Sequence, residues 1–202
     1  MAPWAFGRSM MALSLVGGAL SCNGGDSGTG PGPGPGMGTL TVQMHDDPFD
    51  DAEAVLVTFS EVAAHRSGTG GFQRLPFADG GARRTCDLQR LVDGHNELLG
   101  TGPLPEGHYT GLRLLIVDSR LYFDNKTALP ACAANHPSPG GRSRPVNIPS
   151  GEVLLNREFD VRERATTTIT LDFDGEKSFH STNTAGVFVL QPVIRVVSID
   201  GP

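Results

Sequence analysis

The sequence predicts an antiparallel β-sandwich with one short helix for most of the chain. Two observations lead to this fold class. Apolar and polar residues alternate in several segments, which is the period of a half-buried strand, and Gly, Pro and Asp turn motifs separate those segments. Only one segment has helical spacing. Many short strands with little helix are typical of two antiparallel sheets packed face to face.

The predicted strands begin at residue 39. The first is TLTVQM, residues 39–44, whose apolar residues fall at alternate positions. The second is AVLVTFSEVAAH, residues 54–65, where Val62 breaks the alternation and predicts a bulge or a change of register. The same alternation predicts further strands within residues 108–123, 152–161, 166–174 and 187–199.

Residues 86–100, CDLQRLVDGHNELLG, form the segment with helical spacing. Its apolar residues are Leu88, Leu91 and Val92, followed by Leu98 and Leu99. This pattern predicts one short helix or turn that crosses an end of the sheets.

The amino-terminal residues 1–21 have the order of a secretory signal peptide. Arg8 is followed by an uncharged, largely apolar stretch, which is too short to span a hydrocarbon core of ~30 Å. The Ala19–Cys22 segment resembles the lipobox of bacterial lipoproteins. That resemblance implies that acyl chains, such as palmitate, are attached to Cys22 and anchor the protein. In the enterobacterial sorting rule, an Asp directly after the lipidated cysteine retains a lipoprotein in the inner membrane. Asn23 stands at this position, which implies the outer membrane. The alternative to the lipobox is an ordinary cleaved signal peptide with an unmodified Cys22.

Residues 22–38 consist almost entirely of Gly, Pro, Ser and Thr. Such a segment buries too little apolar surface to offset the entropy of ordering, so we expect a lipid anchor at Cys22 followed by a flexible tether. Residues 39–200 then form one folded domain, a usual size for a single core.

The charge balance argues against nucleic acid as a partner. Without Arg8, which leaves with the signal peptide, 15 basic residues stand against 22 acidic ones, giving a net charge of −7. There is no basic stripe that could neutralise phosphates.

The chain has three cysteines. If Cys22 is lipidated, Cys86 and Cys132 are the remaining pair in an oxidising compartment, and we expect a disulfide between them. The alternative is that one or both thiols are buried and inert. No sequence motif places a catalytic base beside either cysteine.

Several motifs together resemble the bacterial domain-of-unknown-function family 4382. In chain order they are GTLTVQMHDDPFDDAEAVLVTFSEVAAHRS, CDLQRLVDG, LPEGHYTGLRLLI, TTTITLDFDGEKSFH and FVLQPVIRV. The resemblance covers residues 38–197 and implies a domain that follows a lipoprotein signal. Its LPxGxYxxxRL hairpin is similar to hairpins of prealbumin-like and immunoglobulin-like sandwiches. The Pro-rich and Gly-rich insert at residues 125–144, which holds Cys132, departs from the family pattern.

Acidic residues near two strand ends are candidate calcium ligands, because calcium binds six to eight oxygen atoms. The alternative is that they form turns and remain solvated. The candidates are Asp46, Asp47, Asp172 and Asp174, with Glu176 close by.

The histidines are weaker candidates for a metal site. His45, His65, His108 and His180 could bind zinc only if their strand ends met.

Arg113, Asp118 and Arg195 fall within otherwise apolar strands. They either form a buried ion pair, mark a binding face, or lie on the solvated side of a sandwich; the solvated interpretation is favoured.

The sequence contains no G-x-S-x-G, H-E-x-x-H, P-loop or dinucleotide-binding motif. We therefore expect a non-catalytic sandwich, tethered to the outer membrane, that binds an envelope or extracellular ligand, either a glycan or a protein. No cofactor is expected apart from the candidate calcium. The alternatives are a structural envelope protein that assembles through a sheet edge and a hydrolase with an unrecognised site.

Overall fold

The computed structural model describes residues 36–47, 49–68, 71–124 and 129–201. The predicted signal peptide, the predicted lipidation site at Cys22 and the predicted tether as far as residue 35 lie outside these ranges. Within the described ranges, no helix is long and apolar enough to cross a membrane. The first strand begins at Met37, slightly before the predicted domain start at residue 39.

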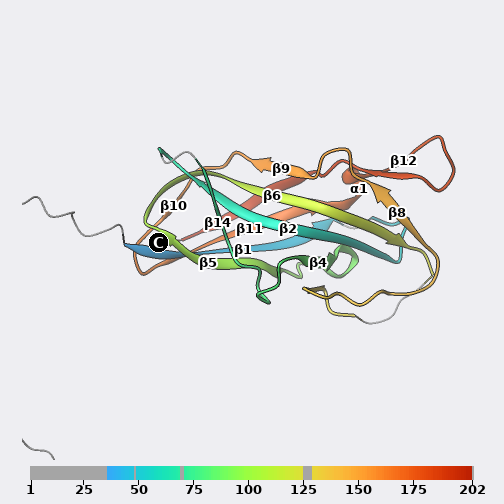
Figure 1. Cartoon of the computed structure of the whole chain (residues 1–202), viewed down its shortest axis with the longest axis horizontal. Coiled ribbons are helices and arrows are strands. Elements are labelled where there is room, and N and C mark those ends of the chain that lie inside the picture. Colours follow the sequence, from blue (N-terminus) through green and yellow to red (C-terminus); the bar gives the residue numbers. More distant parts are fainter. Residues whose placement is uncertain (1–35, 48, 69–70, 125–128, 202) are drawn as a thin grey trace, which may run out of the picture. The chain divides into compact units, whose positions relative to one another are not determined.

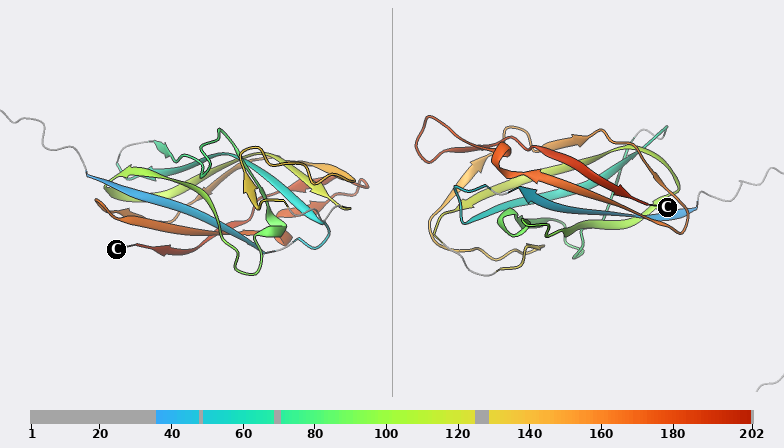
Figure 2. Two further views of the ribbon diagram at one scale, coloured as in Figure 1. Left: turned by 90° about the horizontal axis from the view of Figure 1, so that it is seen from below. Right: turned by 180° about the vertical axis from the view of Figure 1, so that it is seen from behind.

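The smaller sheet has four strands in the order β14-β11-β1-β5. These are β14 (Ile194–Asp200), β11 (Thr166–Asp174), β1 (Met37–Asp47) and β5 (Glu97–Pro105). The right-hand view of Figure 2 shows the four strands side by side in one layer. β1 runs parallel to β11, whereas β1 with β5 and β11 with β14 are antiparallel.

The larger sheet is built on the long pair β2 (Ala54–Arg66) and β6 (Gly107–Tyr122), which cross the centre of Figure 1. Its main path is β12-β13-β8-β6-β2-β4-β7, with β9 and β10 also paired to β6 and β3 paired to β2. The shorter strands are β3 (Phe72–Arg74), β4 (Arg84–Asp87), β7 (Cys132–Ala133), β8 (Ser143–Asn147), β9 (Glu152–Leu155), β10 (Phe159–Val161), β12 (Phe179–Ser181) and β13 (Phe188–Leu190).

One hydrophobic core joins the two sheets and confirms the predicted β-sandwich. Leu40, Val42 and Met44 of β1 are fully buried, and they belong to the same cluster as Val57 and Phe59 of β2. Alternation therefore identified the core-facing side of β1 and of the first half of β2 correctly. Most pairings are antiparallel as predicted, but β1–β11 and β8–β13 are parallel, because alternation fixes the buried face of a strand and not its neighbour.

The predicted irregularity in the second strand is a bulge at Ser60, close to Val62. The register of β2 against β6 shifts between Phe59 and Glu61. The extra residue changes the face onto which the following side chains project, and Glu61 is buried at the start of that altered stretch.

Helical structure is limited to two short segments among the described residues. The predicted helical segment 86–100 contains one turn of 3-10 helix, η1 (Leu88–Arg90), between the end of β4 and the start of β5. The second segment, α1 (Gly175–Ser178), was not predicted from the sequence. Asp174 caps this turn by accepting a hydrogen bond from the backbone N–H of Lys177, a preferred role for aspartate at a helix start.

Candidate functional site

The four aspartates proposed as calcium ligands lie at the ends of two adjacent strands. The parallel register sets His45 beside Asp172 and Asp47 beside Asp174, whereas Asp46 pairs with Phe173. Side chains alternate between the faces of a sheet, so Asp46 projects from the core face and Asp172 and Asp174 from the outer face. The sequence identified these residues as candidate ligands, but not that the two strand ends are neighbours or that the aspartates are divided between two faces.

Cationic side chains of the protein already accompany Asp172 and Asp174. The buried Asp172 carboxylate lies 2.5 Å from Nη2 of Arg195 and 3.4 Å from Nδ1 of His45. The carboxylate of Asp174 pairs with the ammonium group of Lys177. In the described part of the chain, no group of three or more His, Cys, Asp or Glu residues is arranged to hold a metal ion.

Asp46 is buried at the core side of this strand end. Burial raises the pKa of its carboxyl to about 9, and the backbone N–H of Gly175 opposes that rise only in part. Neither carboxyl oxygen makes a hydrogen bond of normal geometry among the described residues. At pH 7 the group is therefore a neutral acid, because the interior disfavours its charged form.

The four candidate histidines have separate surroundings. Nδ1 of His65 lies 2.8 Å from the Thr110 hydroxyl, and Nδ1 of His108 lies 2.9 Å from Oδ1 of Asp160. His45 accompanies Asp172, and His180 is exposed on β12. Three of the side chains thus have local hydrogen-bonding or ionic partners of their own.

The favoured solvated interpretation applies to Asp118 and Arg195, which are exposed, but not to Arg113, which is only partly exposed, and both arginines form ion pairs with buried carboxylates. Arg113 donates from Nε to Oε1 of Glu61 at 2.7 Å, and the Glu61 side chain is fully buried. Arg195 likewise pairs with the buried Asp172. Each arginine thus neutralises a buried carboxylate that would be costly to leave unpaired.

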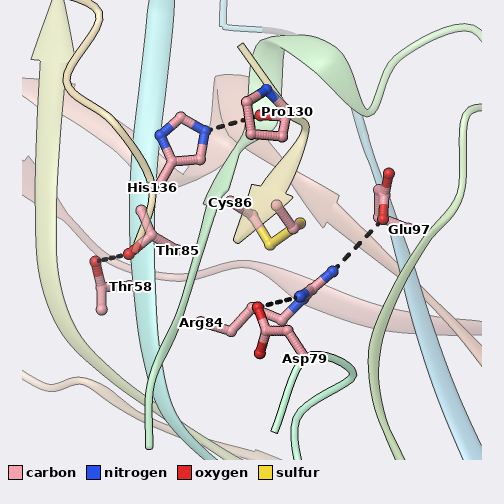
Figure 3. The surroundings of a disulfide bond; sticks show 9 residues. Thr58, Asp79, Arg84, Thr85, Cys86, Glu97, Pro130 and His136 are labelled. Carbon is pink, nitrogen blue, oxygen red and sulfur yellow. Dashed lines mark hydrogen bonds and ion pairs between the residues drawn. A yellow bond between two sulfur atoms is a disulfide. The ribbon is translucent and has the colours of Figure 1, made fainter. Parts of the chain in front are cut away.

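The predicted disulfide is confirmed. Cys86 and Cys132 are bonded and lie directly opposite each other in the β4–β7 pair. Figure 3 shows the neighbouring Arg84 reaching towards Asp79 and Glu97, with closest N–O distances of 2.7 and 3.6 Å. The insert at residues 125–144 therefore returns to the sheet at Cys132.

The best candidate for a binding site is a surface around the segment between β9 and β10. Three hollows adjoin here, with volumes of about 290, 530 and 280 Å³, and Asn156 lines all of them. We call this region the Asn156 surface. Its lining residues are His65, Phe72, Thr110, Gly111, Leu112, Leu154, Leu155, Asn156, Arg157, Glu158, Val196 and Ile199.

A bulge between β9 and β10 creates the Asn156 surface. Leu155 pairs with Leu112 and Phe159 pairs with Tyr109, so residues 156–158 stand opposite only two residues of β6. The extra residue pushes the backbone outward and leaves hollows on either side. All three residues of the bulge are exposed.

The side chains on one flank are held in fixed positions. The Cζ atom of Arg113 lies 4.1 Å from the centre of the Phe72 ring, and His65 packs against the same ring at 5.1 Å between centroids. Across the hollow, Leu154 is 53% exposed. The hollow thus has apolar walls and polar groups at its rim, a composition typical of binding sites.

This surface was not predicted from the sequence. Residues 152–161 were predicted to form a single strand, although three consecutive polar residues, Asn156, Arg157 and Glu158, interrupt the alternation between Leu155 and Phe159. That interruption was the available sign of a break. The positions of Phe72 and Val196 depend on which strands become neighbours, and a single sequence does not specify this.

The fold and this site define a β-sandwich domain that contains one internal disulfide bond among the described residues and has a hollowed surface along one side. The chain belongs to the family described as domain of unknown function (DUF4382), which matches residues 37–192. The search of the curated proteins and the search of the solved structures each gave no significant match.

Proposed function

We propose that the protein is a non-catalytic, lipid-anchored β-sandwich of the outer membrane that binds an envelope or extracellular ligand, a glycan or a protein. The observation that carries the proposal is the meeting of three hollows at Asn156. Their volumes are close to or within the range of about 300–1,000 Å³ that is usual for ligand sites. Apolar walls supply contact area, and the exposed polar bulge supplies hydrogen-bonding groups.

The anchor part of the proposal rests on the sequence around Cys22. Mass spectrometry of the protein extracted from native membranes tests it. We expect the mature chain to begin at Cys22 and to carry acyl chains. An unmodified mature amino terminus would contradict the anchor and place the domain in the periplasm or outside the cell.

Photo-crosslinking in intact cells tests the binding site. A photoreactive residue at position 156 should crosslink to an envelope or extracellular molecule. The same residue at the exposed position 176 on α1, which lines none of the three hollows, is the matched control. The binding function is wrong if position 156 captures nothing beyond the control and a glycan array is also negative.

A further inference from the structure

We infer that the partner at the Asn156 surface is an extended polypeptide segment that adds a strand along the outer edge of β9. This inference rests on the proposed function, because it specifies the class of partner for the same surface. Addition of a strand to a free sheet edge combines main-chain hydrogen bonds with pockets for alternate side chains.

The hydrogen-bond pattern shows which backbone groups of β9 are available. Gly151 accepts a hydrogen bond from the backbone N–H of Ile116 at 2.8 Å, and the β6–β9 register continues from there without a shift. In an antiparallel pair, every second residue directs its N–H and C=O towards the neighbour. Gly151, Val153 and Leu155 therefore face β6, and Glu152 and Leu154 direct their main-chain groups outward.

The nearby edge strand β14 differs from β9 in this respect. The β11–β14 register shifts between Thr170 and Leu171, which leaves Val197 as an extra residue in β14. Such a bulge is one of the ways in which proteins protect an edge strand from pairing. Within its four residues, β9 has no register shift against β6 and contains neither Pro nor Gly, and the bulge of residues 156–158 begins only after Leu155.

Side-chain hollows lie on both sides of this edge. Leu154 projects from the outer face of the larger sheet into the hollow shared with Phe72. Leu155 lies on the core face and, together with Leu154, lines the hollow shared with Val196. A strand beside β9 would place alternate side chains next to these two hollows, so we expect a partner segment with apolar residues at alternate positions.

The same surface is less suited to a glycan. Sugars commonly stack on an open aromatic face, and the aromatic residue that lines this surface, Phe72, has Arg113 above its ring and His65 against it. Ion pairing with Glu61 holds Arg113 in place.

The test measures amide hydrogen exchange and affinity with a defined peptide library. The probes are short synthetic peptides that alternate Val, Ile or Leu with Thr or Lys. We expect at least one peptide to bind and to slow exchange at the Leu154 N–H. Leu154→Pro removes that outward donor without removing a hydrogen bond to β6, a position where an edge strand tolerates proline. It should weaken binding about tenfold, the loss expected for one main-chain hydrogen bond, whereas Leu154→Thr, which keeps the N–H, should weaken it less.

The possible contrary results separate the inference from the proposed function. Equal binding by Leu154→Pro and wild type, or no library peptide that protects Leu154 in the wild-type protein, would overturn strand addition. The exchange measurement uses wild-type protein, so it remains decisive if the proline variant fails to fold. Crosslinks from position 156 to a glycan would also overturn it, but would leave the proposed binding function standing.

Discussion

Arg195 on β14 and Asp172 on β11 form an ion pair that joins the edge strand of the smaller sheet to its neighbour. The closest N–O distance is 2.5 Å; the Asp172 side chain is fully buried, whereas that of Arg195 is 59% exposed. Burial raises the pKa of Asp172, and the nearby Asp47 adds to the rise, while Arg195 and His45 oppose it. The arginine therefore compensates a charge that the sheet interior disfavours.

Replacing Arg195 by Met should lower the free energy of unfolding by roughly 1–3 kcal/mol. Loss of one partner from a fully buried pair costs about 3–5 kcal/mol, and the exposure of Arg195 reduces that figure. Urea denaturation measures the change. In an Asp172→Asn background the same replacement should cost clearly less, and an equal cost in both backgrounds would show that the pair is not responsible.

Asp46 should make the protein less stable as the pH rises. Its pKa is raised from 3.8 to about 9 in the folded protein, so the folded state retains a proton that the unfolded state releases. Asp46 therefore contributes most to the free energy of unfolding below about pH 3.8, where both states are protonated, and this contribution is lost as the pH rises towards 9. The slope reaches about 1.4 kcal/mol per pH unit. Denaturation at several pH values between 5 and 8 should show a smaller slope for Asp46→Asn; an unchanged slope would contradict the assignment.

Removal of the disulfide should lower the free energy of unfolding by about 3–4 kcal/mol, according to the chain-entropy model for a loop of this length. Cys86 and Cys132 are 46 residues apart, and the bond anchors a two-residue strand. The double variant Cys86→Ser, Cys132→Ser should also exchange amide hydrogens faster around β7. Stability equal to that of the oxidised wild type would mean that the bond does not constrain the unfolded chain appreciably.

Gly151→Ala should separate β9 from β6. A Cβ atom at this position would lie 1.9 Å from the carbonyl oxygen of Ile116, and relief of such a clash costs about 1–3 kcal/mol. Gly71→Ala is the matched control, because a Cβ at Gly71 meets no atom within 4 Å. Thermal melts should show a lower Tm for the first variant and little change for the second. Equal melting temperatures would indicate that the backbone adjusts without loss.

Much of the fold could be predicted from short-range pattern. Alternation in residues 39–44 and 166–174 located two strands and their core-facing sides, because successive side chains of a strand project to opposite faces of the sheet. Cysteine count together with compartment predicted the Cys86–Cys132 bond. These inferences require only local periodicity or the number of available partners.

The remaining features depend on which strands become neighbours. The parallel pairing of β1 with β11 brings His45 beside Asp172, and the β11–β14 pairing adds Arg195. No local pattern distinguishes these neighbours from others. The Asn156 surface depends further on a bulge that changes the register by a single residue. The amino-acid composition of a segment does not predict such a change.

The central position of β1 also determines when the domain can fold. Gln43 of β1 hydrogen-bonds to Thr170 of β11, and the two residues are 127 positions apart. Contacts of such long sequence separation form slowly, because a large loop must close first. The edge of β1 that faces β11 thus stays unpaired until residues 166–174 are available, whereas its other edge pairs with β5. The smaller sheet therefore cannot be completed from the amino-terminal half of the chain.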